Sequence, residues 1–277
     1  MNTTTTHAQT EQGVPKLALV TGASSGIGGA FARRLAREGY SLIVAGRRAE
    51  RLAALAAEFP AVAIRPVIAD LGTDAGVAAV AALCANEPLT LLVNNAGVAH
   101  YGAFAQLPAD RASELLHVKV VAPTLLARAA VPGMIARCKA SGGEGTIVNV
   151  AGMLAFGASA PLGRSPGRAA YVAALAHLVA FSQALHEELK DDGVRVQALC
   201  PGIVATEFHE RQGMDLSAVP RMSADDVVTA SLQGLALGEV VCAPGLEQAD
   251  LLRAVSAADL AAFGAQSSQL ADRYRGG

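Results

Sequence analysis

The chain has 277 residues, of which 52% are hydrophobic and 17% are charged, and its formal net charge is −2. This composition allows one sizeable hydrophobic core, and the small charge without basic blocks argues against nucleic acid as a partner. The cysteines, Cys84, Cys138, Cys200 and Cys242, form no CxxC pair. That spacing argues against a metal site or a disulfide framework and favours a reducing, cytoplasmic location.

The N-terminal stretch "MNTTTTHAQTEQGVP" is polar and repetitive, with neither a basic start nor an apolar run. It does not resemble a secretory signal, and we expect a disordered tail over residues 1–14 followed by one domain over residues 15–277. The most apolar helical stretch, "AAYVAALAHLVAF", covers 13 residues. A membrane span needs about 18 or more, so we expect a soluble protein without a span.

Short β-branched runs alternate along the chain with alanine-rich segments of helical period. The expected strands are residues 16–23, 41–46, 61–70, 89–97, 145–150, 194–202 and 239–245. Helical patterns lie between them, for example at residues 28–39, 49–59 and 179–193. The alternation predicts an α/β protein: a single-domain Rossmann fold with a doubly wound parallel sheet of about seven strands.

A glycine-rich turn, "TGASSGIGG" at residues 21–29, follows the first expected strand and opens the first helix. Glycines there permit a tight turn and let a pyrophosphate approach the backbone at the positive end of a helix. Glycines also make ordinary turns, but the flanking strand and helix favour phosphate binding.

The second expected strand ends in "AGRRAERL". A site for NAD usually has a carboxylate here, roughly 20 residues past the glycines, to bind the ribose. This chain has Arg47 and Arg48 instead, and arginine suits a 2′-phosphate through its charge and bidentate geometry. We therefore expect NADP(H) in preference to NAD; the alternative is that both arginines are solvated at a helix start.

Four motifs in the correct order give the chain a family resemblance over residues 16–210. The turn "TGASSGIG", the strand end "NNAG" (94–97), a tyrosine opening a long helix and "PGIVAT" (201–206) resemble the classical short-chain dehydrogenase/reductase superfamily. The segment "EVVCAPGLEQADLL" (239–252) is similar to a looser subgroup that often acts on hydrophobic substrates.

The resemblance implies a role for each matching position of the cofactor site. In chain order, these positions would bind the dinucleotide phosphates, the 2′-phosphate, the adenine, the ribose and the nicotinamide. The implied residues are Gly22, Ser24, Ser25, Ile27 and Gly28; Arg47 with Arg48; Asp70 and Leu71; Asn95, Ala96 and Gly97; and Pro201, Gly202, Val204 and Thr206.

The catalytic positions of the same family are altered in three of four cases. The family tyrosine is kept as Tyr171, but the lysine one helical turn later is Leu175. The family serine aligns with Gly152, and the asparagine aligns with Lys119. Loss of the cation raises a tyrosine pKa by roughly 1–3 units, and loss of an oxyanion donor costs on the order of 10²–10³ in rate.

Several side chains are candidates to replace the missing groups. Lys119 would supply an ammonium group near Tyr171; the alternative is a lysine that reaches solvent or an interface. Ser159 or Ser165 would return a hydroxyl, although both suit an ordinary glycine- and proline-rich loop. Three further residues have acid–base groups near the pocket mouth but are more typical of packing or surface positions: His100, Tyr101 and His117.

Two functions from different classes follow. In the first, the protein is an atypical NADP(H)-dependent oxidoreductase that reduces a hydrophobic carbonyl, imine or activated alkene, with Tyr171 as acid and Lys119 as electrostatic support. In the second, the fold serves a non-redox reaction or a binding or partner role. Both take a small molecule, and the resemblance implies a homodimer or homotetramer built on helices at residues 110–137 and 168–190.

Overall fold

The computed structural model describes residues 16–161 and 167–275. The expected tail over residues 1–14 lies outside the described residues. The chain divides into two compact units, one up to Pro244 and one from Gly245. Among the described residues, the second unit contains α8 (Asp250–Gly264) and a short 3₁₀ helix at Asp272–Tyr274. All of the sheet and all of the predicted site residues belong to the first unit.

A seven-stranded parallel sheet forms the first unit, in the order β3-β2-β1-β4-β5-β6-β7. The strands are β1 (Leu17–Thr21), β2 (Ser41–Gly46), β3 (Ile64–Ile68), β4 (Leu91–Asn94), β5 (Gly145–Val150), β6 (Val194–Leu199) and β7 (Val241–Cys242). The predicted doubly wound parallel sheet of seven strands is therefore confirmed. The strand order reverses between β1 and β4, which opens a crevice at their carboxyl ends.

The strand ends differ from the prediction where loops carry apolar residues. Residues 61–70 were expected as a strand, but β3 covers Ile64–Ile68 and lies at the edge of the sheet. Pro66 has no N–H to donate, and an edge strand tolerates this. The last strand was expected over seven residues, but β7 has two, because the chain turns at Pro244 and Gly245.

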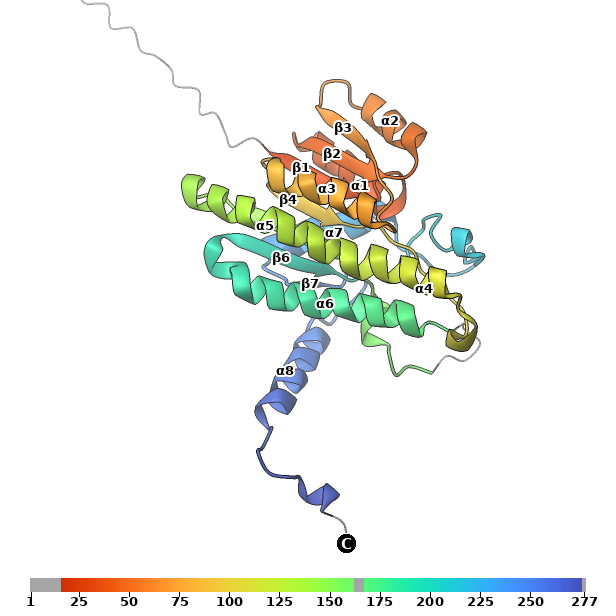
Figure 1. The fold of residues 1–277 in the computed structure, drawn as a ribbon, viewed down its shortest axis with the longest axis vertical. Helices are drawn as coiled ribbons and strands as arrows, with labels where there is room; N and C mark the ends of the chain where they lie inside the picture. The colour runs from red at the N-terminus through yellow and green to blue at the C-terminus, as the bar shows by residue number, and fades with distance from the viewer. Residues whose placement is uncertain (1–15, 162–166, 276–277) are drawn as a thin grey trace, which may run out of the picture. The chain divides into compact units, whose positions relative to one another are not determined.

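Helices cover both faces of the sheet (Figure 1). One apolar layer contains α3 (Asp74–Asn86), α5 (Ala122–Ser141) and α6 (Ala169–Leu189). The opposite layer contains α1 (Gly26–Arg37), α2 (Ala49–Ala57) and α7 (Ala224–Ala236). The helix expected at residues 179–193 is part of α6. This helix starts earlier than expected, at Ala169, because the apolar segment before residue 179 is also helical.

A continuous helical stretch runs from α4 (Ala109–Leu116) through a π-helical turn at His117–Val121 into α5. This stretch and Ala169–Asp192 are long and apolar enough to cross a membrane by length and composition alone. Both exceed the 13-residue apolar run noted in the sequence. Both also contribute buried residues to the core against the sheet, such as Leu126 and Leu178, as core helices do.

Gly76 lies where α3 packs against the loop after β3. A Cβ atom at Gly76 would lie 2.0 Å from the carbonyl oxygen of Asp70, whereas at Gly133 of α5 it would meet only the guanidinium of Arg137. We expect Gly76→Ala to lower the free energy of unfolding by on the order of 1–3 kcal/mol. Urea denaturation of Gly76→Ala and of the control variant Gly133→Ala is the measurement. An equal stability of Gly76→Ala and Gly133→Ala would contradict the close packing.

Candidate active site

A cavity of about 940 Å³ lies at the carboxyl ends of the strands, where the strand order reverses. It is lined by both predicted catalytic residues, Tyr171 and Lys119, and by all the predicted cofactor residues except Gly28. Those cofactor residues are Gly22, Ser24, Ser25, Ile27, Arg47, Arg48, Asp70, Leu71, Asn95, Ala96, Gly97, Pro201, Gly202, Val204 and Thr206. The volume is in the range of small-molecule sites.

Gly28 lies behind the cavity wall, where helix α1 packs against the end of β4. A Cβ atom there would lie 2.3 Å from Nδ2 of Asn95 and 2.5 Å from the carbonyl oxygen of Gly22. The Asn95 amide donates to the carbonyl oxygens of Thr21 at 2.9 Å and Gly22 at 3.3 Å. Glycine at position 28 is thus required by packing, and it shapes the cavity from behind.

The N-terminus of α1 opens into the cavity and suits an anion. Ser25 is its N-cap residue, and the first turn, which starts at Gly26, contains no acidic side chain. Gly22 has φ of 65°, a left-handed conformation that favours glycine. Free N–H groups and the positive end of the helix fit dinucleotide phosphates in this position.

The two arginines after β2 are held by different partners. Arg48 donates to Oγ of Ser24 at 2.9 and 3.0 Å and to Oγ of Ser25 at 2.6 Å, and it pairs with Glu207. Arg47 lies 3.3 Å from the carboxylate of Glu114 and 3.8 Å from that of Asp70. Both arginines thus line the cavity with a carboxylate as partner.

Glu207 is the centre of an arginine cluster that the sequence did not reveal. Its carboxylate pairs with Arg48, lies 2.9 Å from Arg51 and lies 3.7 Å from Arg211. Burial acts to raise the pKa of Glu207, but hydrogen bonds from Arg48, Ser25 and Arg51 outweigh it and lower the pKa to about 2. The carboxylate is therefore charged at neutral pH, beside the N-cap of α1.

A second carboxylate, Glu114 of α4, connects the cofactor side of the cavity to its mouth. It accepts hydrogen bonds from Arg47 at 3.3 Å and Arg111 at 3.2 Å, and it contacts Nε2 of His100 at 2.8 Å. The backbone N–H of His100 donates to Oε1 of Gln212 at 3.1 Å. His100 is thus held at the pocket mouth by side chains of two other elements.

Tyr171 lies in the first turn of α6 and is 8% exposed. Its ring packs edge-on against Tyr101, with centroids 5.3 Å apart, and lies 6.4 Å from Phe208. Burial and then the neighbouring Tyr101 raise the pKa of Tyr171 well above its ordinary value. The hydroxyl is therefore a neutral proton donor over the whole physiological range.

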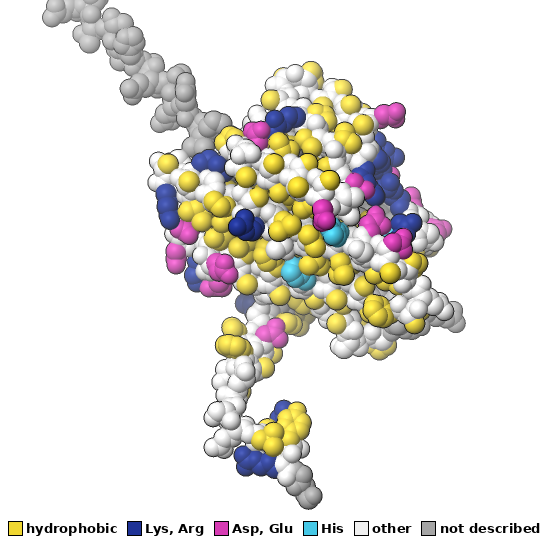
Figure 2. Space-filling model, viewed as in Figure 1, with side chains coloured by type: hydrophobic (Ala, Val, Ile, Leu, Met, Phe, Trp, Pro, Cys, Tyr) yellow, Lys and Arg dark blue, Asp and Glu magenta, His cyan; other side chains and the backbone are white. Residues whose placement is uncertain are grey.

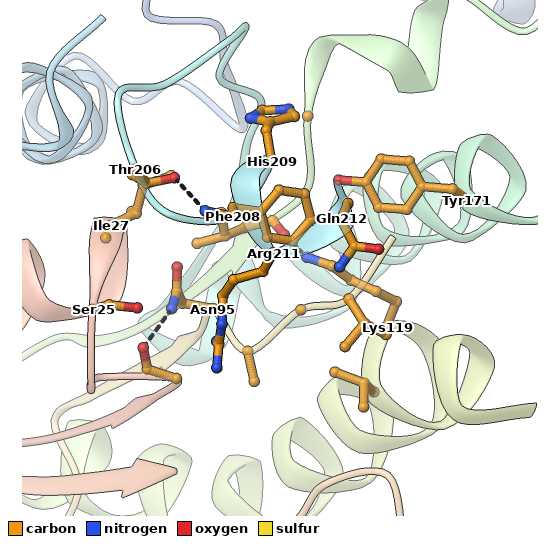
Figure 3. Close-up of a pocket in the computed structure, with 18 of the residues that line it drawn as sticks. Ser25, Ile27, Asn95, Lys119, Tyr171, Thr206, Phe208, His209, Arg211 and Gln212 are labelled. Atoms are coloured by element: carbon orange, nitrogen blue, oxygen red, sulfur yellow. Dashed lines mark hydrogen bonds between the residues drawn. The ribbon is translucent and has the colours of Figure 1, made fainter. Parts of the chain in front are cut away.

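Lys119 lies in the π-helical turn and is 5% exposed. Its ammonium donates to the carbonyl oxygen of Val150 at 3.1 Å, and a Cβ atom at Gly97 would lie 2.8 Å from Nζ. Burial lowers the pKa of Lys119 to about 8. Figure 3 shows Lys119 and Tyr171 entering the same pocket from different helices, across from Ser25 and Ile27.

The positions of the missing family groups lie together. A Cβ atom at Gly152 would be 3.4 Å from Cδ1 of Leu175, an ordinary contact, so a Cβ atom fits there. Leu175 is 1% exposed and also lines the cavity. Ser159 is exposed, away from the residues that line the cavity. Ser165 lies outside the described residues.

Other candidates divide between the cavity and the surface. His100 and Tyr101 line the cavity, whereas His117 contacts Asp74 at 2.8 Å on the outer face of the helix. Sequence reasoning missed Glu114 and Glu207 altogether. Glu207 directly follows the predicted cofactor residue Thr206, and that adjacency was the available signal.

The fold and the cavity define a nucleotide-binding α/β protein with its site at the strand-order reversal. Residues 16–216 match the family model of the short chain dehydrogenases. The chain belongs to this family of oxidoreductases.

Two solved structures are similar over nearly the whole chain. One is a short-chain dehydrogenase from Sphingobium yanoikuyae in complex with NADPH, 35% identical, with a TM-score of 0.86 over 94% of this chain and 100% of that one. The other is the bulky-bulky ketone specific alcohol dehydrogenase from Comamonas testosteroni, 32% identical, with a TM-score of 0.81 over 95% and 99%.

One similar protein is named as inactive. The inactive 2-(S)-hydroxypropyl-CoM dehydrogenase 2 of Xanthobacter autotrophicus is 34% identical over 196 residues, which is 70% of this chain and 80% of that protein.

The buried ammonium of Lys119 predicts a pH-dependent stability. Its folded-state pKa of about 8 lies below the ordinary 10.5, so the unfolded chain binds the proton more tightly. The cost is present in full below about pH 8 and is relieved as the pH rises towards 10.5. We expect Lys119→Met to raise the free energy of unfolding at neutral pH by on the order of 3 kcal/mol, with the gain lost at alkaline pH.

Denaturant unfolding of the wild type and Lys119→Met across this pH range is the measurement. Lys139→Met is the matched control, because the Lys139 side chain is 66% exposed. A Lys119→Met gain that stays constant with pH would contradict a charged amine buried in the native state.

Glu207 predicts an effect on nucleotide affinity. Its carboxylate competes with an entering phosphate for Arg48 and for the N-terminus of α1. We expect Glu207→Gln to tighten NADPH binding by about 1 kcal/mol, or roughly fivefold. Titration by nucleotide fluorescence measures this, with Glu210→Gln, an exposed change in the same segment, as control. Weaker binding would mean that Glu207 instead holds the arginines in place for the nucleotide.

Proposed function

We propose that the protein is an NADPH-dependent reductase that acts on a hydrophobic carbonyl, imine or activated alkene. The observation that carries the proposal is one cavity that joins the glycine turn and both arginines to Tyr171 and Lys119. The similar dehydrogenase from Sphingobium yanoikuyae is described in complex with NADPH. Arg47 and Arg48 at the end of β2 favour the phosphorylated cofactor, through charge and bidentate geometry.

Tyr171 is the acid in this proposal. When bound, the nicotinamide cofactor supplies a hydride, and the proton for the substrate heteroatom comes from the tyrosine hydroxyl. Burial keeps that hydroxyl protonated, which suits reduction. The reverse direction would need a phenolate, and burial opposes its formation. The reduction direction is therefore favoured.

Lys119 is the electrostatic support. Its ammonium is held in the cavity wall by the Val150 carbonyl and is sealed from bulk water. A buried positive charge stabilises negative charge that develops on the substrate in the transition state. With a pKa of about 8, Lys119 carries this charge at neutral pH and loses it as the pH rises further.

The substrate end of the cavity favours an apolar molecule. Its lining includes Leu107, Met153, Leu154, Ile203 and Phe208. The similar alcohol dehydrogenase of Comamonas testosteroni is described as specific for bulky-bulky ketones. We propose a ketone with two large substituents as the first substrate class to test.

A non-redox or binding role is the second candidate. Leu175 and Gly152 remove two of the family's polar groups, and a relative that is 34% identical is described as inactive. In this case the dinucleotide site serves a structural purpose, or the cavity binds another ligand. The cofactor side of the cavity suits both functions, so an experiment must separate them.

The assembly and location belong to the same proposal. Figure 2 shows a mostly apolar surface over α5 and α6, and Leu116 and Leu125 are 45% and 43% exposed on the α4–α5 stretch. Exposed apolar side chains on packed helices suit a homodimer or homotetramer. We place this assembly in the cytoplasm, because all four cysteines are free thiols.

The test begins with titration of the purified protein with NADPH and, separately, NADH. We expect saturable, NADPH-selective binding, and NADPH oxidation in the presence of a bulky aromatic ketone. Tyr171→Phe should lower turnover by on the order of 10²–10⁴ with little change in NADPH affinity. Lys119→Met should lower turnover below pH 8 and remove its decline above that pH.

A double variant separates the two functions. Gly152→Ser with Leu175→Lys restores the family's serine and lysine at positions where a Cβ at 152 meets ordinary contacts. Turnover by the wild type supports the unusual reductase. Turnover by the double variant alone, with an inactive wild type, supports the non-redox or binding role, and failure to bind either nucleotide would overturn the reductase proposal.

A further inference from the structure

The buried Tyr171 hydroxyl needs a source of protons between turnovers. Once it has given its proton to a substrate, it must be reprotonated, yet the side chain is 8% exposed. On its own helix, one turn away, stands Leu175, and Gly152 beside that leucine has no side chain. The direct neighbours at these two positions therefore provide no proton.

Tyr101 is the polar group that meets Tyr171 from another element. Its ring is half-buried and stands at 70° to the ring of Tyr171, with centroids 5.3 Å apart. Burial raises the pKa of both tyrosines, and a side-chain hydrogen bond between them adds to the increase for Tyr171 and acts against it for Tyr101. A hydroxyl hydrogen rotates to suit its partner, so Tyr101 can donate to the oxygen of Tyr171.

The positive charge of Arg168 acts on Tyr101. Arg168, immediately before α6, acts to lower the pKa of Tyr101, although burial, the largest effect, raises it. Arg168 acts on the pKa of Tyr101, whereas the pKa of Tyr171 is shifted by burial and by Tyr101. A negative charge in this tyrosine pair is therefore better placed on Tyr101, next to the guanidinium.

The backbone around Tyr101 is built for this contact. The N–H of Gly102 donates to the carbonyl oxygen of Gly167 at 2.8 Å, so the loop after β4 is bonded to the segment that enters α6. A Cβ atom at Gly167 would lie 2.2 Å from the carbonyl oxygen of Gly102. Glycine at 167 is thus required for the two segments to approach.

The residue before Tyr101 is in an unfavourable conformation. His100 has φ of 48°, which non-glycine residues rarely adopt. Gln212 holds its backbone N–H and Glu114 holds its ring. Strain of this kind persists where surrounding contacts fix it, as they do here in the residue before Tyr101.

We propose that Tyr101 is a relay residue that carries a proton from solvent to Tyr171. The inference rests on the proposed reductase function. As the O–H bond of Tyr171 breaks in favour of the substrate heteroatom, the O–H bond of Tyr101 breaks and its proton moves to the Tyr171 oxygen. The phenolate left on Tyr101 is stabilised by Arg168 and then takes a proton from water, so the pair returns to its initial state.

The relay also explains how the site works without the family's lysine. The charge left by proton transfer does not stay on the buried Tyr171, where burial penalises it most. It moves one residue outward to a half-buried phenol that has a cation beside it. Tyr101 and Arg168 together perform this task.

The first test uses the full-length protein without nucleotide. The chain has four tyrosines, so carbon-13 at Cζ of tyrosine gives a small set of resonances, assigned with single Tyr→Phe variants. The resonances are followed from neutral to alkaline pH. We expect Tyr171→Phe and Arg168→Gln each to move the Tyr101 titration to higher pH, and Tyr274→Phe, an exposed control, to leave it unchanged.

The second test measures turnover with NADPH and benzil, an aromatic diketone. We expect Tyr101→Phe to lower kcat by on the order of 10² with an unchanged NADPH dissociation constant, and to alter the solvent deuterium isotope effect. Arg168→Gln should lower kcat less than Tyr101→Phe does.

The outcomes separate the two proposals. Wild-type turnover that is unaffected by Tyr101→Phe overturns the relay and leaves the reductase intact. A Tyr101 titration that is indifferent to Tyr171→Phe overturns the relay as well, because the hydroxyls would then not be in contact. Absence of wild-type turnover overturns the reductase, and the relay falls with it, whatever the tyrosine resonances show.

Discussion

The contact between helix α1 and Asn95 is the constraint on which the site depends. Gly28 has no room for a Cβ atom, and the Asn95 amide holds the carbonyl oxygens of Thr21 and Gly22. In return, Oγ1 of Thr21 accepts hydrogen bonds from the backbone N–H groups of Asn95 and Ala96. These bonds fix the ends of β1 and β4 together, and the cavity opens where those two strands diverge.

Charge in the cavity is arranged in pairs that span distant parts of the chain. Glu207 and Glu114 each hold arginines at the end of β2, while Lys119 is bonded to a backbone carbonyl. Desolvated charges without partners are costly, and pairing lowers that cost. The same pairs become available to an anionic ligand, because a phosphate offers the arginines an equivalent partner.

Much of the fold and of the cofactor side could be predicted from sequence, because local patterns determine them. The apolar runs at β1, β2 and β5 and the glycine turn before α1 depend on residues close together in the chain. The contact of Arg48 with Glu207 joins residues 159 positions apart, and no local pattern specifies it. The pairing of Tyr101 with Tyr171 likewise depends on how a loop closes against a helix start, through Gly102 and Gly167.

The π-helical turn at His117–Val121 lets one helical stretch place two charged side chains in the cavity. An α-helix turns by about 100° per residue, so positions five apart normally face away from each other. A π turn accommodates an additional residue within a turn. Glu114 and Lys119 therefore both line the cavity. One continuous helical stretch thus brings a carboxylate and an ammonium group into a single cavity, although the two residues stand five positions apart in the chain.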